Sequence, residues 1–236
     1  FSDIPRQKMS AVIYSFTSFT TSNSYIVKPF NDEKCFVVDL PPDLDNVIEF
    51  INNKNLTVAG ALITHGHYDH SLGLSNFEGK AYINLDDEFL ARNPQEQIRS
   101  LLRSSFEVGE YTGDLISITE LPSEIVKVHN NPGHTKGSVS YEFPDEGLIF
   151  TGDFVFKDGI GRTDLFTGSM DEMKNSINNT FQNFNEEYDI LPGHGPSDKV
   201  KTIKENNEFI KMLIDDWTGK RYKKYRKWRF CEVLTC

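Results

Sequence analysis

The chain has 236 residues, of which 38% are hydrophobic and 25% charged, and its net charge at neutral pH is −10. This composition leaves room for a sizeable core and excludes general nucleic-acid binding through the main body. No segment approaches the roughly 18 apolar residues of a membrane span, and three cysteines are too few for a disulfide framework. We therefore expect a cytoplasmic protein, or an organellar one if a targeting segment has been removed.

The first part of the chain predicts three strands and a helix. Between residues 11 and 38, β-branched and aromatic runs alternate with the turn-forming sequences TTSN and NDEK, a pattern typical of an antiparallel meander. Residues 43–53 then place apolar side chains at helical spacing, and Asp43 is a suitable N-cap for that helix. The apolar run VAGALIT, residues 58–64, predicts a strand that is buried on both faces.

Four side chains that can bind metal follow this strand within the sequence THGHYDH, residues 64–70. They are His65, His67, Asp69 and His70, and three of the six histidines of the chain are among them. Neutral imidazole and carboxylate groups are good ligands for zinc or iron. We therefore predict a metal site at the end of the strand, and the alternative is a polar loop with incidental histidines.

The middle of the chain predicts covering helices followed by further strands. Residues 86–106 are polar with apolar positions at helical spacing and are interrupted at Pro94. The runs LISITEL and EIVKVHNN predict two strands, and SVSYEF with GLIFTGD predicts a hairpin closed by PDEG. His129 lies inside a strand without a ligand partner at close spacing, so we interpret it as structural.

The last part of the chain repeats the order of strands and helices. Ser169 and Glu172 form a capping box in front of an apolar stripe, YDILPGHG predicts a strand, and residues 203–217 predict one final helix. No linker separates the two halves. We therefore predict one α/β domain over residues 1–210, a four-layer αββα sandwich, with residues 211–236 as a helix and a tail without a domain of their own.

The tail contains the sequence KRYKKYRKWR, residues 220–229, with seven of the 25 Lys and Arg residues. One interpretation is a patch for RNA or an anionic membrane. The favoured interpretation is a terminal helix that packs its aromatic side chains on an acidic body and leaves its charges in water. No DNA partner is expected.

Three later motifs place further metal ligands in tight turns after short β-runs. His134 lies in PGHTKGS, Asp153 in FTGDF and His194 in LPGHG. Because strand ends can meet at one edge of a sandwich, we expect all three to converge with THGHYDH on one rim.

In this order the motifs resemble those of the metallo-β-lactamase superfamily, and of its glyoxalase II-like branch, from about Ser24 to Phe209. The resemblance implies the metallo-β-lactamase fold with two divalent ions, zinc first, with iron or manganese as alternatives. It assigns the ligands by position, with His65, His67 and His134 on the first ion, Asp69, His70 and His194 on the second, and Asp153 bridging them. Asp69 and Asp153 are then the catalytic carboxylates.

The activity implied by the resemblance is hydrolysis of a small-molecule thioester such as S-lactoylglutathione. Bound zinc lowers the pKa of water from about 15.7 to about 7, so a hydroxide held between two ions can attack the carbonyl carbon. The thiolate leaves readily because its conjugate acid has a pKa of about 8.5. A glutathione-derived substrate is therefore the partner that we expect.

The sequence GIGRTD, residues 159–164, is similar to a segment of short glyoxalase II-like hydrolases and of persulfide dioxygenases. By this resemblance Arg162 is the candidate group for binding a substrate carboxylate, and the alternative is a salt bridge within the loop. Asp164 stands where glyoxalase II has a tyrosine, and GHGP replaces its GHEY. We also expect no long helical C-terminal domain like that of glyoxalase II, so the resemblance does not extend to the contacts with glutathione.

Three other functions are set against the thioester hydrolase, and one of them, β-lactam hydrolysis, is disfavoured by the GIGRTD segment. The GRTD segment favours a persulfide dioxygenase with a single iron, but the complete second ligand set favours two ions. A binding protein whose metal only stabilises the fold is the third hypothesis, with the basic tail as its interaction element.

Overall fold

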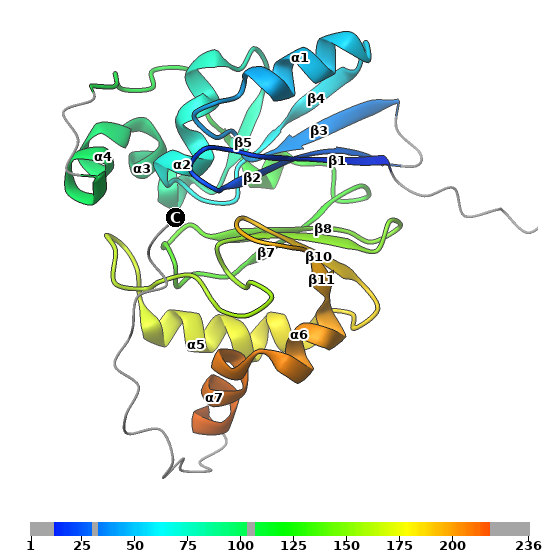
Figure 1. The fold of residues 1–236 in the computed structure, drawn as a ribbon, viewed down its shortest axis with the longest axis vertical. Helices are drawn as coiled ribbons and strands as arrows, with labels where there is room; N and C mark the ends of the chain where they lie inside the picture. Colours follow the sequence, from blue (N-terminus) through cyan, green and yellow to red (C-terminus); the bar gives the residue numbers. More distant parts are fainter. Residues whose placement is uncertain (1–11, 30–32, 103–106, 218–236) are drawn as a thin grey trace, which may run out of the picture.

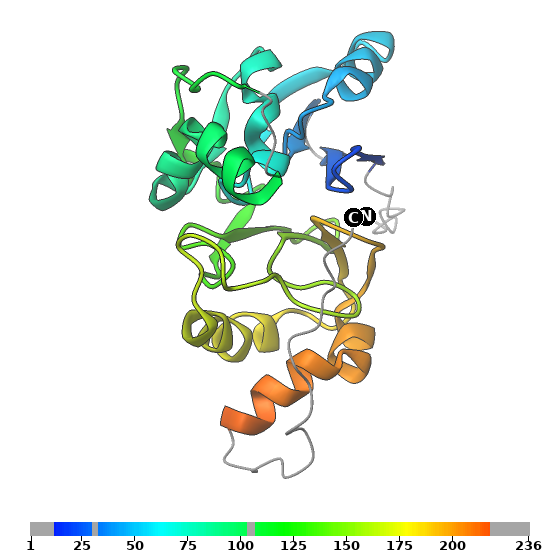
Figure 2. The same cartoon turned by 60° about the vertical axis from the view of Figure 1, so that its left-hand side comes forward.

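The computed structural model describes residues 12–29, 33–102 and 107–217, and shows two β-sheets face to face with helices on both outer sides. In Figure 1 α1 covers the first sheet from above, and α5 and α6 cover the second sheet from below. Figure 2 shows the same stacking after a turn of the molecule. The predicted four-layer αββα sandwich is therefore confirmed.

The first sheet has six strands in the order β1-β2-β3-β4-β5-β6. The strands are β1 Val12–Thr17, β2 Asn23–Lys28, β3 Lys34–Val38, β4 Thr57–Leu62, β5 Ala81–Ile83 and β6 Ile116–Ser117. The first three pair antiparallel, as the predicted meander requires, and β3 to β6 pair parallel. Because β3 and β4 are parallel, Asp39 and the THGHYDH segment leave the sheet at the same edge.

The second sheet has five strands in the order β11-β10-β9-β8-β7. The strands are β7 Lys127–Asn130, β8 Val139–Phe143, β9 Leu148–Gly152, β10 Asp189–Pro192 and β11 Asp198–Lys199. β8 and β9 form the predicted hairpin, whereas β9 and β10 pair parallel. Asp153 and His194 therefore follow parallel neighbours and emerge at one edge.

Seven α-helices and four short 3-10 helices complete the described residues. The α-helices are α1 Asp45–Asn53, α2 Tyr68–Ser71, α3 Glu88–Arg92, α4 Pro94–Leu102, α5 Met170–Asn179, α6 Val200–Asn206 and α7 Glu208–Trp217. The 3-10 helices are η1 Leu72–Asn76, η2 Leu85–Asp87, η3 Ile118–Glu120 and η4 Phe181–Asn183. Within the described residues, none of these helices is long and apolar enough to cross a membrane.

The core lies in three layers of buried apolar side chains. Phe36, Tyr141 and Phe150 belong to the layer between the two sheets, whereas α1 covers a second layer and α5 to α7 cover the third. Removing these large side chains from water is the main stabilising contribution to the fold. The loops at the strand ends can therefore be built from polar residues without loss of the fold.

Three local predictions are corrected by the structure. Asp43 does not cap α1, because its Oδ2 accepts a hydrogen bond from the backbone N–H of Phe19 at 3.1 Å and Leu44 occupies the cap position. The predicted final helix breaks at Asn207, whose Oδ1 accepts hydrogen bonds from the N–H groups of Phe209 and Ile210 at the start of α7. LISITEL forms only the two-residue strand β6 before it turns into η3.

Two predictions about the C-terminal part stay open. The proposed boundary at residue 210 falls inside α7, whose Ile210 and Leu213 are buried in the third core layer. The basic sequence 220–229 lies outside the described residues.

Candidate metal centre

The seven predicted ligands come together at the edge where the two sheets meet. Three groups of possible ligand atoms each lie within 4.8 Å of one another, and they are His65–His67–His134, His65–His70–Asp153 and Asp69–His70–His194. The sixth histidine, His129, lies elsewhere, and its Nε2 pairs with Oε2 of Glu142 at 2.6 Å. His129 is therefore a structural residue, as its position in a strand predicted.

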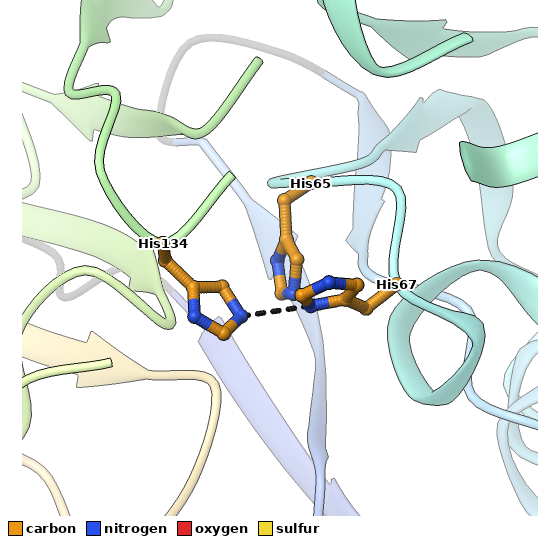
Figure 3. Close-up of side chains that lie close together, drawn as sticks. All are labelled: His65, His67 and His134. Carbon is orange, nitrogen blue, oxygen red and sulfur yellow. Dashed lines mark hydrogen bonds between the residues drawn. The ribbon is translucent and has the colours of Figure 1, made fainter. Parts of the chain in front are cut away.

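The first group, His65, His67 and His134, is called the histidine cluster (Figure 3). Nδ1 of His67 lies 2.8 Å from Nε2 of His134, and the ring of His65 stands edge-on to both. All three side chains are almost fully buried. Burial, followed by the neighbouring His134, lowers the pKa of His67 to about 3, and burial also lowers the pKa of His65. These two imidazoles are thus held neutral, which is the form that binds a metal ion.

The third group, Asp69, His70 and His194, is called the carboxylate cluster. Oδ2 of Asp69 lies 3.2 Å from Nε2 of His194 and 3.5 Å from Nε2 of His70. Burial alone would lower the pKa of His70, but the carboxylates of Asp69, Asp153 and Asp39 raise it, and the pKa of His194 is also raised. This cluster therefore attracts positive charge, in contrast to the histidine cluster.

Asp153 lies between the two clusters. Its Oδ2 is 3.4 Å from Nε2 of His134 and 3.6 Å from Nε2 of His194, and its Oδ1 is 3.4 Å from Nε2 of His70. Burial would raise the pKa of Asp153, but the charges of His194 and His70 hold it well below its usual value. An ionised carboxylate at this position can bind a metal ion on either side.

The outer ring nitrogens of four histidines are anchored, which leaves their inner nitrogens directed into the site. Nδ1 of His134 donates to the carbonyl oxygen of Arg162 at 2.7 Å, and Nδ1 of His70 donates to Oδ2 of Asp39 at 2.8 Å. The anchors of the other two rings are hydroxyl groups: Thr64 Oγ1 at 3.1 Å for His65 and Thr21 Oγ1 at 3.2 Å for His194. Such bonds fix the tautomer and direction of a metal-binding imidazole.

The donor set fits divalent metal. Nε2 of His65 and Oδ1 of Asp153 are buried and have no hydrogen-bond partner within the described residues. A buried polar atom without a partner is costly, and a metal ion would satisfy both. The combination of imidazole and carboxylate ligands suits zinc, iron or manganese.

Two glycines shape the backbone around Asp153. Gly152 has a φ of +51°, and a side chain there would collide with Thr64. A Cβ atom at Gly193 would collide with Oδ1 of Asp153 and lie 2.8 Å from Cε1 of His70. The glycines of TGD and PGHG are therefore required by left-handed backbone in one case and by close approach in the other.

Two buried carboxylates that the sequence analysis missed hold the ligand loops in place. Asp39 accepts hydrogen bonds from the N–H and hydroxyl groups of Thr64 and from His70, at 2.7 to 2.8 Å. Asp87 accepts from the N–H groups of Gly66 and Gly137 and from the hydroxyl of Thr135, at 2.6 to 2.8 Å. Asp87 thus ties the loop of His65 and His67 to the loop of His134.

The turn between β1 and β2 was also missed as part of the site. In addition to the contact of Thr21 with His194, the hydroxyl of Ser22 donates to the carbonyl oxygen of Asp69 at 2.7 Å. In the sequence this turn is an ordinary TTSN segment. Asp39, by contrast, had a recognisable pattern, because it follows an apolar strand as Asp153 does.

Arg162 lies next to the histidine cluster, but its side chain is paired within its own loop. Its Nε and Nη2 donate to the two oxygens of Asp164 at 2.7 and 2.8 Å. Hydrogen bonding to Arg162 lowers the pKa of Asp164. The loop salt bridge that the sequence allowed is therefore present, and contact of Arg162 with a substrate stays a prediction.

The sequence profile of the metallo-β-lactamase superfamily matches residues 17–207. The chain belongs to this superfamily. It is 29% identical over 197 residues to the probable metallo-hydrolase YqgX of Bacillus subtilis, an alignment that covers 80% of this chain and 92% of the relative. It is also 27% identical over 214 residues to the hydroxyacylglutathione hydrolase GloC of Haemophilus influenzae, with 86% and 98% covered.

Among solved structures, the metallo-β-lactamase fold recurs in TTHA1623, which was crystallised in a di-iron-bound form. Its TM-score is 0.74 at 20% sequence identity, and the match covers 83% of this chain and 99% of the other. This likeness shows the fold, and the curated relatives support metallo-hydrolase as the coarse function.

Proposed function

We propose that the chain is a two-metal hydrolase that cleaves an acyl thioester such as S-lactoylglutathione. The observation that carries this proposal is the division of seven donors into two clusters with Asp153 between them. The histidine cluster would hold one ion, the carboxylate cluster the other, and Asp153 both. Such ions supply water that is acidic enough to lose a proton near neutral pH, together with Lewis-acid activation of a carbonyl group.

The residues of the chain then have separate tasks. His65 and His134 present inner ring nitrogens from anchored rings, and burial holds His65 and His67 neutral, so the first position needs little rearrangement. Oδ2 of Asp69, which reaches His70 and His194, would orient the attacking water as well as bind metal. A thiolate leaving group has a conjugate-acid pKa of about 8.5 and needs little help from a general acid.

The choice of substrate and metal rests on the relatives. One relative is named a hydroxyacylglutathione hydrolase, which supports a thioester. Another protein of the same fold was crystallised with two irons, so iron is a realistic alternative to zinc, and manganese is a further alternative because it accepts the carboxylate ligands.

The test is release of free thiol from S-lactoylglutathione and a panel of other acyl thioesters by protein loaded with zinc or iron. We expect thiol release that a chelator stops and that His67→Ala abolishes, whereas Phe209→Ala on α7 retains it. Full metal loading without thiol release from any thioester would contradict the proposal. Sulfide-dependent oxygen uptake with one iron per chain would point instead to a persulfide dioxygenase.

A further inference from the structure

Two phenylalanines lie exposed beside the histidine cluster, on segments far apart in the sequence. Phe89 of α3 is 53% exposed and Phe166 of the loop before α5 is 68% exposed, yet their ring centroids are only 6.2 Å apart. Single exposed apolar side chains are common, but a pair that meets across two loops covers a continuous apolar area. We call this pair the aromatic rim.

The aromatic rim lies beside the loops that bear the histidine cluster. A Cβ atom at Gly66, between His65 and His67, would collide with Leu90 of α3, so α3 packs directly on that loop. The loop of Phe166 contacts the loop of His134, because the N–H of Lys136 donates to Thr167 Oγ1 at 3.3 Å. In Figures 1 and 2 the loop leading into α5 rises towards α3 and α4.

Three cations near the aromatic rim are each paired with a carboxylate of the chain itself, and one of them is Arg92 of α3, whose Nε lies 2.9 Å from Oε1 of Glu88. Arg162 makes the two-pronged pair with Asp164, and Nζ of Lys136 lies 2.9 Å from Oδ1 of Asp86. A substrate carboxylate that approaches the Nε–Nη2 edge of Arg162 therefore competes with Asp164, and the charge of Asp164 repels it at the remaining donors. The two exposed rings are thus flanked by ion pairs of the chain itself, which suits an apolar ligand better than an anionic one.

We propose that the aromatic rim receives the apolar acyl chain of an uncharged thioester, and that Asp164 disfavours anionic thioesters through its own charge and by occupying one edge of Arg162. The proposal rests on the proposed function and narrows its substrate class. Glutathione thioesters, with two carboxylates, would be poorer substrates than uncharged ones with the same acyl group.

The test measures binding of thioethers, which cannot be hydrolysed, by calorimetry at fixed ionic strength. The probes are S-octylglutathione, the uncharged N-acetyl-S-octylcysteamine and its short-chain S-ethyl counterpart. Wild-type protein should bind the uncharged octyl probe most tightly. Phe89→Ala and Phe166→Ala should weaken that binding about tenfold, because apolar contact area is lost, and should remove the advantage of octyl over ethyl.

A second set of variants tests the role of Asp164. Asp164→Ala should strengthen binding of S-octylglutathione about fivefold without helping the uncharged probe, and adding Arg162→Ala should remove that gain. Matched controls are Phe209→Ala, an exposed phenylalanine on α7, and Asp189→Ala, whose partner Lys199 lies 2.8 Å away. Neither control should change the affinity of any probe.

Three results would overturn the proposal: equal affinity for octyl and ethyl probes, tighter wild-type binding of S-octylglutathione, or a change of oligomeric state in Phe166→Ala with unchanged probe binding. The proposed function fails separately, if the probes bind as expected but no thioester is cleaved. Cleavage without any effect of these variants would contradict only the inference about the substrate.

Discussion

The histidine cluster and the carboxylate cluster share Asp153 but differ in charge and in support. In the first, burial lowers the pKa of His65 and His67, and Asp87 joins the two loops. In the second, carboxylates raise the pKa of His70 and His194, and support comes from Asp39 and the β1–β2 turn. Two rings of the first cluster are thus held neutral by burial, whereas the histidines of the second favour their protonated form until a cation replaces the protons.

The largest effect is expected at the residue that the two clusters share. Asp153→Ala removes the carboxylate that reaches His134, His70 and His194. We expect loss of metal from both clusters and thiol release below detection, measured by elemental analysis and a thiol assay. Retention of a full metal load would show that Asp153 belongs to neither cluster, and a melting curve of the metal-free variant controls for unfolding.

Lowering the pH should separate the clusters. Protons compete with metal for imidazole nitrogens, so the raised pKa of His70 and His194 makes the carboxylate cluster lose its ion first as pH falls. Between about pH 7 and pH 5 the metal content per chain should drop by half, while the histidine cluster, with the pKa of His67 near 3, retains its ion. Dialysis at stepped pH followed by metal analysis checks this, and loss of both ions in one step would contradict it.

The two buried supporting carboxylates should affect different clusters. Asp87→Asn places amide hydrogens against the donor of either Gly66 or Gly137, so metal in the histidine cluster should bind about 10- to 100-fold more weakly. Asp39→Asn should weaken the carboxylate cluster by a similar factor. Chelator competition measures the histidine cluster alone in a His194→Ala background and the carboxylate cluster alone in a His67→Ala background. Equal effects of the two substitutions on both clusters would contradict the separate support of the clusters.

The smallest effect is expected at the histidine outside both clusters. His129→Ala removes a partly exposed pair with Glu142, which costs less than about 1 kcal/mol of unfolding free energy. Metal content and thiol release should stay at the wild-type level. A loss of metal in this variant would mean that the clusters extend beyond the seven residues.

Most of the site could be predicted from the sequence, because its ligands stand in glycine-containing turns that follow short strands. His134, Asp153 and His194 each have that pattern, and the parallel pairing of β9 and β10 brings two of them to one edge. Asp87 lacked the pattern, since it lies in the polar segment DDE that looks like a solvated helix start. Its role depends on contacts with Gly66 and Gly137, which are 21 and 50 residues away.

The fold was predictable in its layers but not in all of its details. Alternation and helical spacing identified the meander, the hairpin and α5. The break between α6 and α7 was missed because Asn207 makes hydrogen bonds to the carbonyl oxygens of Phe156 and Gly159, contacts that helical spacing does not reveal. Asp43 was a reasonable cap locally, but the tertiary contact with Phe19 determines where its side chain lies.

The most direct test of the two-cluster account is the metal content of wild-type protein, His67→Ala and His194→Ala, determined together with thiol release. The account predicts two ions per chain in the wild type and one in each variant, with thiol release abolished in both variants. A wild-type protein that binds only one ion at saturation, or a single variant that loses all metal, would contradict it.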